Sequence, residues 1–182
     1  VEHLVFPLRA EAHTLPFPRG FFDVVVSVDA YQYFGTDVLY LEYISGFLKP
    51  GGALGVVMPG LTQPFTTGIP EHLTIPQANG KVFWEDECAC FKTTDWWREH
   101  WAANGYINNV HADTQRDGWR HWRDFETALG LSGKNVFPSD AETLERDAGQ
   151  YIGFVRLTAT RTEKDAMNLY DSSIGVQFGV DK

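Results

Sequence analysis

The stretch "LPFPRGFFDVVVSVDAYQYF", residues 15–34, decides the fold. A turn over 15–20 leads into the run 23–28, which is almost entirely apolar and rich in β-branched side chains. A continuous run of this kind is typical of a strand that a parallel sheet buries on both faces. Polar and aromatic side chains follow at once. Because open α/β sheets bind their ligands at the carboxyl ends of strands, we expect a binding site over residues 27–33.

A second strand is predicted close behind the first. Apolar residues recur every three or four positions between 38 and 48, which is the spacing of an amphipathic helix. The sequence Pro50-Gly51-Gly52 is a strong stop for that helix, and the apolar run Ala53–Met58 follows it. Strand, helix and strand joined by short turns predict a right-handed βαβ unit.

The rest of the chain supplies further elements of the same class. Val1–Leu8 reads as a short strand whose Pro7 favours a sheet edge. Residues 59–92, with several prolines and glycines, read as a lid-like loop. Helices are expected over 93–105 and 117–130, and a short helix is expected to open over 138–142. Strands are expected over 106–113 and 151–161, the last of them antiparallel. We therefore expect one domain over 1–164 and a tail over 165–182.

Composition narrows the class of protein. The 182 residues carry a net charge of −9, which argues against binding nucleic acid through a broad basic face. No apolar run is long enough to predict a membrane span. The chain has only two cysteines, Cys88 and Cys90, so a reducing cytoplasm is the expected compartment. Alternation in a strand would pack both thiols on one face, and we expect no metal there.

A series of short motifs resembles the second half of a class I S-adenosylmethionine-dependent methyltransferase. The motifs are Glu11-Ala12, Leu15-Pro16-Phe17, Phe22-Asp23-Val24-Val25, Ser27 with Asp29-Ala30, and Leu48-Lys49-Pro50-Gly51-Gly52. Residues 84–122 are similar to a small-molecule branch often grouped with cyclopropane-fatty-acid-synthase-like enzymes. The resemblance covers residues 5–161. It implies a doubly wound, Rossmann-like α/β sandwich, S-adenosylmethionine as cofactor and a small-molecule methyl acceptor.

The resemblance also implies roles for individual residues. Expected cofactor contacts are Glu11 and Ala12 at the adenine, and Ser27, Val28, Asp29 and Ala30 at the methionine half. Expected substrate contacts are Tyr31, Gln32 and Trp84. Asp29 and Tyr33 are candidate catalytic groups, with His72 of the lid as a third. Asp29 could instead cap the turn that follows the strand. Paired tryptophans of the later helices, Trp97 with Trp101 and Trp119 with Trp122, fit the core better than a cage for a cation.

Two parts of the family pattern are missing. Neither the glycine-rich E/D-x-G-x-G-x-G loop nor the acidic residue for the ribose is present. In the family both precede the segment that matches Val1, so we expect the chain to lack the N-terminal part of the domain. Relatives order their strands 3-2-1-4-5-7-6, and the missing strands would leave an unpaired edge, which predicts a homodimer. A truncated domain that acts only through association is therefore an alternative to an enzyme. A Rossmann-type oxidoreductase is weaker, because its fingerprint is missing too.

Overall fold

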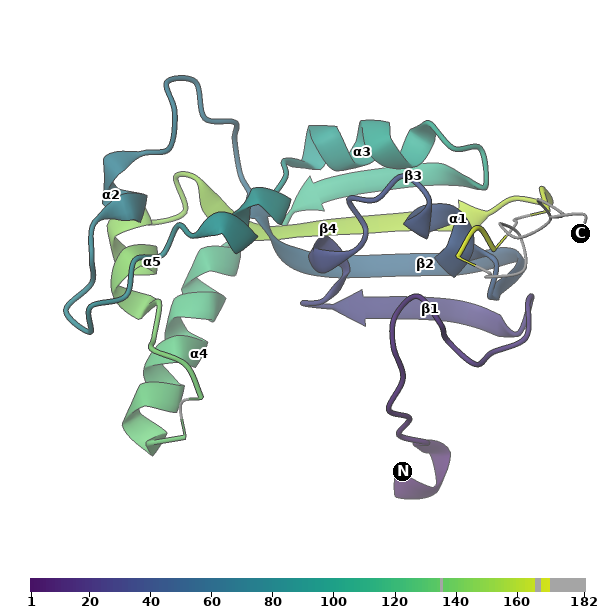
Figure 1. Ribbon diagram of the computed structural model, residues 1–182, viewed down its shortest axis with the longest axis horizontal. Coiled ribbons are helices and arrows are strands. Elements are labelled where there is room, and N and C mark those ends of the chain that lie inside the picture. Colours follow the sequence, from purple (N-terminus) through teal and green to yellow (C-terminus); the bar gives the residue numbers. More distant parts are fainter. Residues whose placement is uncertain (135, 166–167, 171–182) are drawn as a thin grey trace, which may run out of the picture.

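A four-stranded mixed sheet forms the centre of the molecule (Figure 1). The computed structural model describes residues 1–134, 136–165 and 168–170. The strands are β1 (Phe22–Val28), β2 (Leu48–Leu61), β3 (Ile107–Thr114) and β4 (Ile152–Arg161), in the order β1-β2-β4-β3. β1 runs parallel to β2, whereas β4 is antiparallel to both of its neighbours. The predicted antiparallel strand is confirmed, and so is the doubly wound α/β class.

The helices fall into two groups. α1 (Tyr40–Ser45) and α3 (Thr94–Ala102) pack on one face of the sheet. α2 (Glu71–Thr74), α4 (Gly118–Ser132) and α5 (Ala141–Asp147) form a helical lobe beyond the end of the sheet where β1 and β2 finish (Figure 1). Three short 3₁₀ helices lie at Glu2–Leu4, Tyr31–Tyr33 and Asp86–Cys90. None of the helices in the described part of the chain has the length and apolar character needed to span a bilayer.

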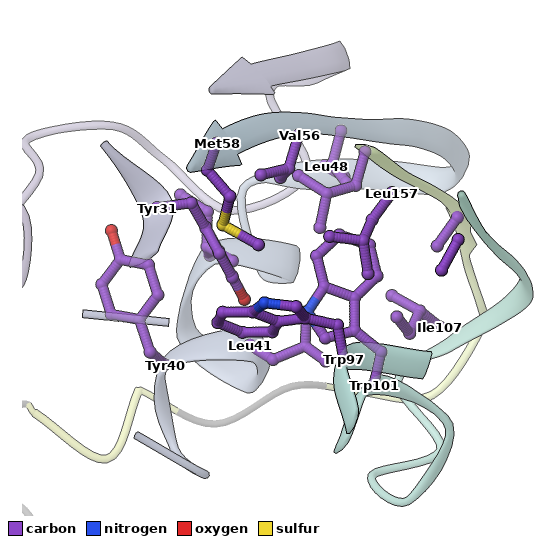
Figure 2. Close-up of a cluster of buried hydrophobic side chains, with 14 of the residues drawn as sticks. Tyr31, Tyr40, Leu41, Leu48, Val56, Met58, Trp97, Trp101, Ile107 and Leu157 are labelled. Carbon is purple, nitrogen blue, oxygen red and sulfur yellow. The ribbon is translucent and has the colours of Figure 1, made fainter. Parts of the chain in front are cut away.

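The main core lies between the sheet and the two helices α1 and α3. Trp97 and Trp101 are fully buried on α3, and Figure 2 shows them against Met58 and Leu157 of the sheet. Thr93 caps this helix as predicted, since its hydroxyl accepts the amide hydrogen of Trp96 at 3.3 Å. The expectation that these two tryptophans belong to the core is confirmed.

The opposite face of β1 departs from the prediction. Val24, Val26 and Val28 are 55%, 67% and 67% exposed, so the strand is buried on one face only. Their register partners on β2 are Ala53, Gly55 and Val57, on the face away from α1 and α3. An apolar run indicates that a strand is suited to burial. It does not show that other segments of the same chain pack over it. β1 is also an edge strand, because β2 is its sole partner among the described residues.

Three local expectations are also corrected. Val1–Leu8 forms no strand: it is exposed throughout and contains only the 3₁₀ turn Glu2–Leu4. Pro50-Gly51-Gly52 does not lie at the end of a helix but within β2, which begins at Leu48. The register between β1 and β2 shifts in this region, between Phe22 and Val24. Cys88 and Cys90 lie in a 3₁₀ helix, not in a strand.

A buried arginine fastens β4 to the end of α1. Arg161 is 6% exposed, and its guanidinium donates to the carbonyl oxygens of Ser45 and Leu48, both at 3.0 Å. It also donates to the carbonyl of Lys164 at 3.2 Å. Carbonyl groups at a helix end have no partner within the helix, so the arginine takes over that role.

Candidate functional site

Asp29 begins a tight turn directly after β1. Its φ of 52° lies in the left-handed region, which aspartate tolerates better than most residues. The amide of Asp29 donates to the carbonyl of Val57 at 2.8 Å, so the turn is tied to the neighbouring strand. The Asp29 carboxylate accepts a hydrogen bond from Nε2 of Gln32 at 3.1 Å. Backbone and side chain together hold the carboxylate at the carboxyl end of β1.

Gln32 and Tyr33 complete this cluster. Gln32 is fully buried, and its Oε1 has no hydrogen-bond partner in the part of the chain that the structure describes. Partial burial raises the pKa of Asp29 above 3.8, against the effect of the Gln32 hydrogen bond. Burial and the nearby Asp29 charge raise the pKa of Tyr33 as well. Near neutral pH the cluster therefore contains the Asp29 carboxylate with its raised pKa and the protonated phenol of Tyr33. It also contains the buried Oε1 of Gln32, which has no hydrogen-bond partner among the described residues.

A pocket opens between Tyr33 and the lid-like loop. Its volume is about 210 Å³. It is lined by Tyr33, Lys81, Phe83, Glu85, Glu87, Cys88, Phe91, Trp122 and Asp140, and we call it the lid pocket. Three parts of the chain that are distant in sequence thus meet at the carboxyl end of β1: the turn after that strand, the lid-like loop, and the helical lobe.

Trp84 lies in a second, adjoining cavity of about 430 Å³. Its ring meets Phe65 edge-on at 4.9 Å between centroids. The two cavities share Cys88 and Phe91 in their linings, so Trp84 lies one wall away from the lid pocket. Trp84, a predicted substrate contact, and Tyr33, a predicted catalytic residue, therefore line different cavities that share this wall.

The N-terminal segment passes close to the turn after β1. The carboxylate of Glu11 accepts hydrogen bonds from the amide and ring of His13, both at 2.8 Å, and these bonds lower its pKa. The carbonyl of Ala12 accepts the hydroxyl of Tyr40 at 3.2 Å. The ring of His13 meets Phe34 at 6.2 Å between centroids, which brings this segment beside the residues that follow Tyr33.

Not every predicted site residue joins the cluster. His72 lies on α2, in the helical lobe, where Nε2 bonds to the buried carboxylate of Asp147 at 2.9 Å. Tyr31 is 1% exposed and packs between Trp97 and Trp101, in the core. Ser27 is partly buried on the core side of β1, while Val28 is exposed on the opposite face and Ala30 is partly buried in the turn. The structure therefore gathers Asp29, Gln32 and Tyr33 and leaves His72 and Tyr31 in structural positions.

Several lining residues of the lid pocket were not predicted from the sequence. Phe91 and Trp122 come from segments about thirty residues apart, and Glu85 and Glu87 look like ordinary solvated acids in a loop. A signal in the sequence is the concentration of aromatic residues between 83 and 122. The paired tryptophans among them are expected in the core.

The N-terminal part of the chain matches the family profile described as "methyltransferase domain" over residues 2–56. This range runs from the first residues through the Asp29 turn and α1 into β2. Comparison with curated protein sequences gives no match. The sequence match therefore covers the segment that carries Asp29, Gln32 and Tyr33.

Solved structures of similar fold include methyltransferases and a cyclase. Phosphoethanolamine N-methyltransferase 2 of Haemonchus contortus, in complex with S-adenosylmethionine, matches with a TM-score of 0.59 at 15% identity, over 84% of this chain and 36% of that one. Geranyl diphosphate C-methyltransferase of Streptomyces coelicolor matches with a TM-score of 0.56 at 11% identity, over 84% and 52%. The [4+2]-cyclase SpnF matches with a TM-score of 0.52 at 17% identity, over 84% and 54%.

These comparisons confirm the predicted Rossmann-like methyltransferase fold, and residues 2–56 resemble a methyltransferase profile. The chain spans between 36% and 54% of the lengths of these three structures. At identities of 11–17% the shared feature is the fold, and one of the three proteins is named for a cyclisation. The reaction has to be argued from the site.

Proposed function

We propose that this chain takes part in methyl transfer from S-adenosylmethionine to a small-molecule acceptor. The observation that carries the proposal is the cluster of Asp29, Gln32 and Tyr33 at the carboxyl end of β1, next to a pocket and inside the segment that matches a methyltransferase profile. Ligands of open α/β sheets bind in this location. The named methyltransferases with the same fold support the choice of cofactor.

The residues of the cluster fit the methionine half of that cofactor. A sulfonium and an ammonium group both need oxygen atoms nearby, and the Asp29 carboxylate can supply them. Gln32 is fully buried and supports that carboxylate through its hydrogen bond. At the adenine half, Ala12 is the residue proposed to contact the ring. The Glu11 carboxylate already accepts hydrogen bonds from His13. When bound, the cofactor supplies an activated methyl group on a positively charged sulfur.

The chain's own residues would orient the acceptor and hold its proton. Methyl transfer depends mainly on placing the nucleophile in line with the methyl group. Tyr33 lines the lid pocket and can orient an acceptor there by hydrogen bonding. Tyr33 stays protonated, because its pKa is raised, so the carboxylate of Asp29 beside it is the candidate to take a proton from the acceptor. His72 is held by Asp147 and has no role in this arrangement.

Calorimetric titration with S-adenosylhomocysteine tests the proposal. We expect saturable heat with the unaltered chain, and binding about tenfold weaker in Asp29→Ala, because the loss of one charge-assisted hydrogen bond corresponds to roughly 1.4 kcal/mol. Asp23→Asn is the matched control, since Asp23 lies on the same strand at its far end and pairs with Lys49. Absence of heat at millimolar ligand would refute the proposal for this chain.

The second candidate function is association without catalysis, favoured by the free edge of β1. Val24, Val26 and Val28 are exposed there, and an unpaired edge strand readily adds a strand from another chain. This supports a homodimer built on β1, whether or not the chain also binds a cofactor. The two free thiols support a cytoplasmic location, and the acidic net charge supports small molecules over nucleic acid as ligands.

A further inference from the structure

The lid pocket has the chemistry of a receptor for a small organic cation. We propose that it binds an ammonium compound, and that this is the class of methyl acceptor; the second part rests on the function proposed above. The pocket's aromatic wall, its unpaired carboxylates, and its position beside Tyr33 each support this inference.

The aromatic wall consists of Phe83, Phe91 and Trp122. The ring of Trp122 lies 5.8 Å from that of Phe83 at 57°, and 6.4 Å from that of Phe91 at 71°. All three rings line the pocket, and the ring of Trp122 is stacked on Phe154 at 5.6 Å. The faces of aromatic rings attract cations, with trimethylated ammonium groups as the best-known ligands of such walls.

The carboxylates of the pocket outnumber its cations. Lys81 is held by Asp140 at 2.8 Å, so that pair is close to neutral. Glu85 and Glu87 also line the pocket, and their carboxylates have no ion-pair or hydrogen-bond partner among the described residues. Both glutamates are solvent-exposed, so the pocket keeps two hydrated carboxylates, without ion-pair partners among the described residues, beside its aromatic wall. A neutral or anionic ligand would leave these charges unpaired, whereas a cation would be attracted by both.

Cys88 helps to choose between an organic cation and a metal ion. Burial, together with the nearby charges of Asp140 and Glu85, raises the pKa of its thiol to about 11. The thiol therefore stays protonated near neutral pH and is a poor metal ligand. Among the described residues no group of three or more potential metal ligands gathers here or elsewhere. The volume of about 210 Å³ suits a compact amine rather than a larger ligand.

The position of the pocket connects it to the proposed reaction. Tyr33 belongs both to the lining and to the Asp29 cluster, so a ligand in the pocket lies beside the carboxyl end of β1. In the transfer, the lone pair of a neutral amine forms the new nitrogen–carbon bond while the bond from carbon to the sulfonium of the donor breaks. The sulfur leaves as a neutral thioether. The proton that the bound ammonium must lose beforehand goes to Asp29 or to water.

Choline and its neutral isostere 3,3-dimethyl-1-butanol are suitable probes, since they share a shape and differ in charge. Binding is measured by tryptophan fluorescence and calorimetry with no methyl donor present. We expect choline to bind at least tenfold more tightly than the alcohol. The double variant Glu85→Gln/Glu87→Gln should weaken choline binding about tenfold and leave the alcohol unaffected. Asp86→Asn is the matched control, because Asp86 lies between the two glutamates but does not line the pocket.

Two results would overturn the inference: equal affinities for choline and the alcohol, or equal choline binding in the double variant and in Asp86→Asn. Titrating the same variants with S-adenosylhomocysteine separates this inference from the proposed function. Selective choline binding with no heat from S-adenosylhomocysteine would uphold the cation site and refute methyl transfer. Heat from S-adenosylhomocysteine without choline selectivity would refute the cation site and uphold methyl transfer.

Discussion

At the scale of single residues, Asp29, which we propose as a site residue, differs from its neighbours in backbone conformation and in pKa. It combines a left-handed backbone conformation with a carboxylate of raised pKa, whereas Asp23 on the same strand has its pKa lowered by Lys49. The sequence predicted Asp29 because a polar residue followed an apolar run. It could not predict the pairing of His72, named as a catalytic candidate, with Asp147, which lies 75 residues further along the chain.

Asp29→Asn should stabilise the fold at pH 7. The folded state raises the pKa of this carboxyl above 3.8, so the ionised form is less favourable in the fold than in the unfolded chain. The stabilisation by Asp29→Asn should decrease as the pH falls toward 3.8, because the Asp29 carboxyl group of the unaltered protein then becomes protonated and neutral as well. Thermal unfolding at several pH values between 7 and 4 measures this. Asp23→Asn should show the opposite sign at pH 7, because Lys49 stabilises the ionised form of Asp23 in the fold. Equal shifts in the two variants would contradict the argument.

Arg161→Met should destabilise the fold by about 3 kcal/mol, because it leaves buried carbonyl groups without their donor. Those groups are the carbonyls of Ser45 and Leu48. Urea unfolding measures the change. Arg116→Met is the control, since the Arg116 side chain is 97% exposed and its loss should be close to neutral. A loss below about 1 kcal/mol for Arg161→Met would mean that water can replace the guanidinium.

At the scale of elements, prediction succeeded where a local pattern determines the outcome. The paired tryptophans of α3 lie in the core as expected, and the strand expected over 151–161 forms as β4. Prediction failed where the outcome depends on distant partners. The contacts of α4 are one example, because Phe125 is 61% exposed and Trp122 lines the lid pocket. The lid pocket was missed for the same reason, since it is assembled from separate segments.

Thr93→Ala should destabilise the fold by about 1 kcal/mol, because α3 loses the side-chain acceptor at its first turn. Chemical denaturation of the purified chain provides the measurement. Thr127→Ala on α4 is a fair comparison, since the Thr127 hydroxyl bonds within its own helix to the carbonyl of Arg123. Equal losses in the two variants would show that the cap is not what the substitution removes.

Val26→Lys should abolish self-association and leave the stability of the monomer nearly unchanged. Val26 lies on the edge strand and is 67% exposed, so a charge there costs little in the monomer and blocks pairing with another strand. Light scattering at micromolar concentration reports the mass of both proteins. A monomeric mass for the unaltered chain would refute the proposed homodimer.

At the scale of the whole molecule, the described residues form two hydrophobic clusters, and both stabilise the folded state. The larger lies between the sheet and the helices α1 and α3, and the smaller joins the lid-like loop to the helical lobe through Leu73, Phe83, Cys88, Leu144 and Ile152. Asp147 fastens the smaller cluster, since its carboxylate accepts bonds from His72 and from the amides of Tyr151 and Ile152. The composition of the chain predicted one domain, but gave no sign that its packing is divided.

Asp147→Asn should loosen the helical lobe without loosening the main core. We expect faster hydrogen exchange in peptides over α2 and α5, and unchanged exchange in peptides over α3 and the first half of β2. Exchange followed by mass spectrometry resolves these peptides. Asp124→Asn, at an exposed position on α4, is the control. Uniform loss of protection across the chain would show that the two clusters unfold together.

The position of β1 links assembly to chemistry. The strand that holds Asp29 and leads to Tyr33 is also the strand with a free edge and an exposed apolar face. Its carboxyl end is therefore supported from one side only, by β2. Any polypeptide that pairs with the free edge will restrict the motion of the Asp29 turn and of the adjoining wall of the lid pocket. If the proposed homodimer pairs through this edge, ligand affinity should rise with protein concentration.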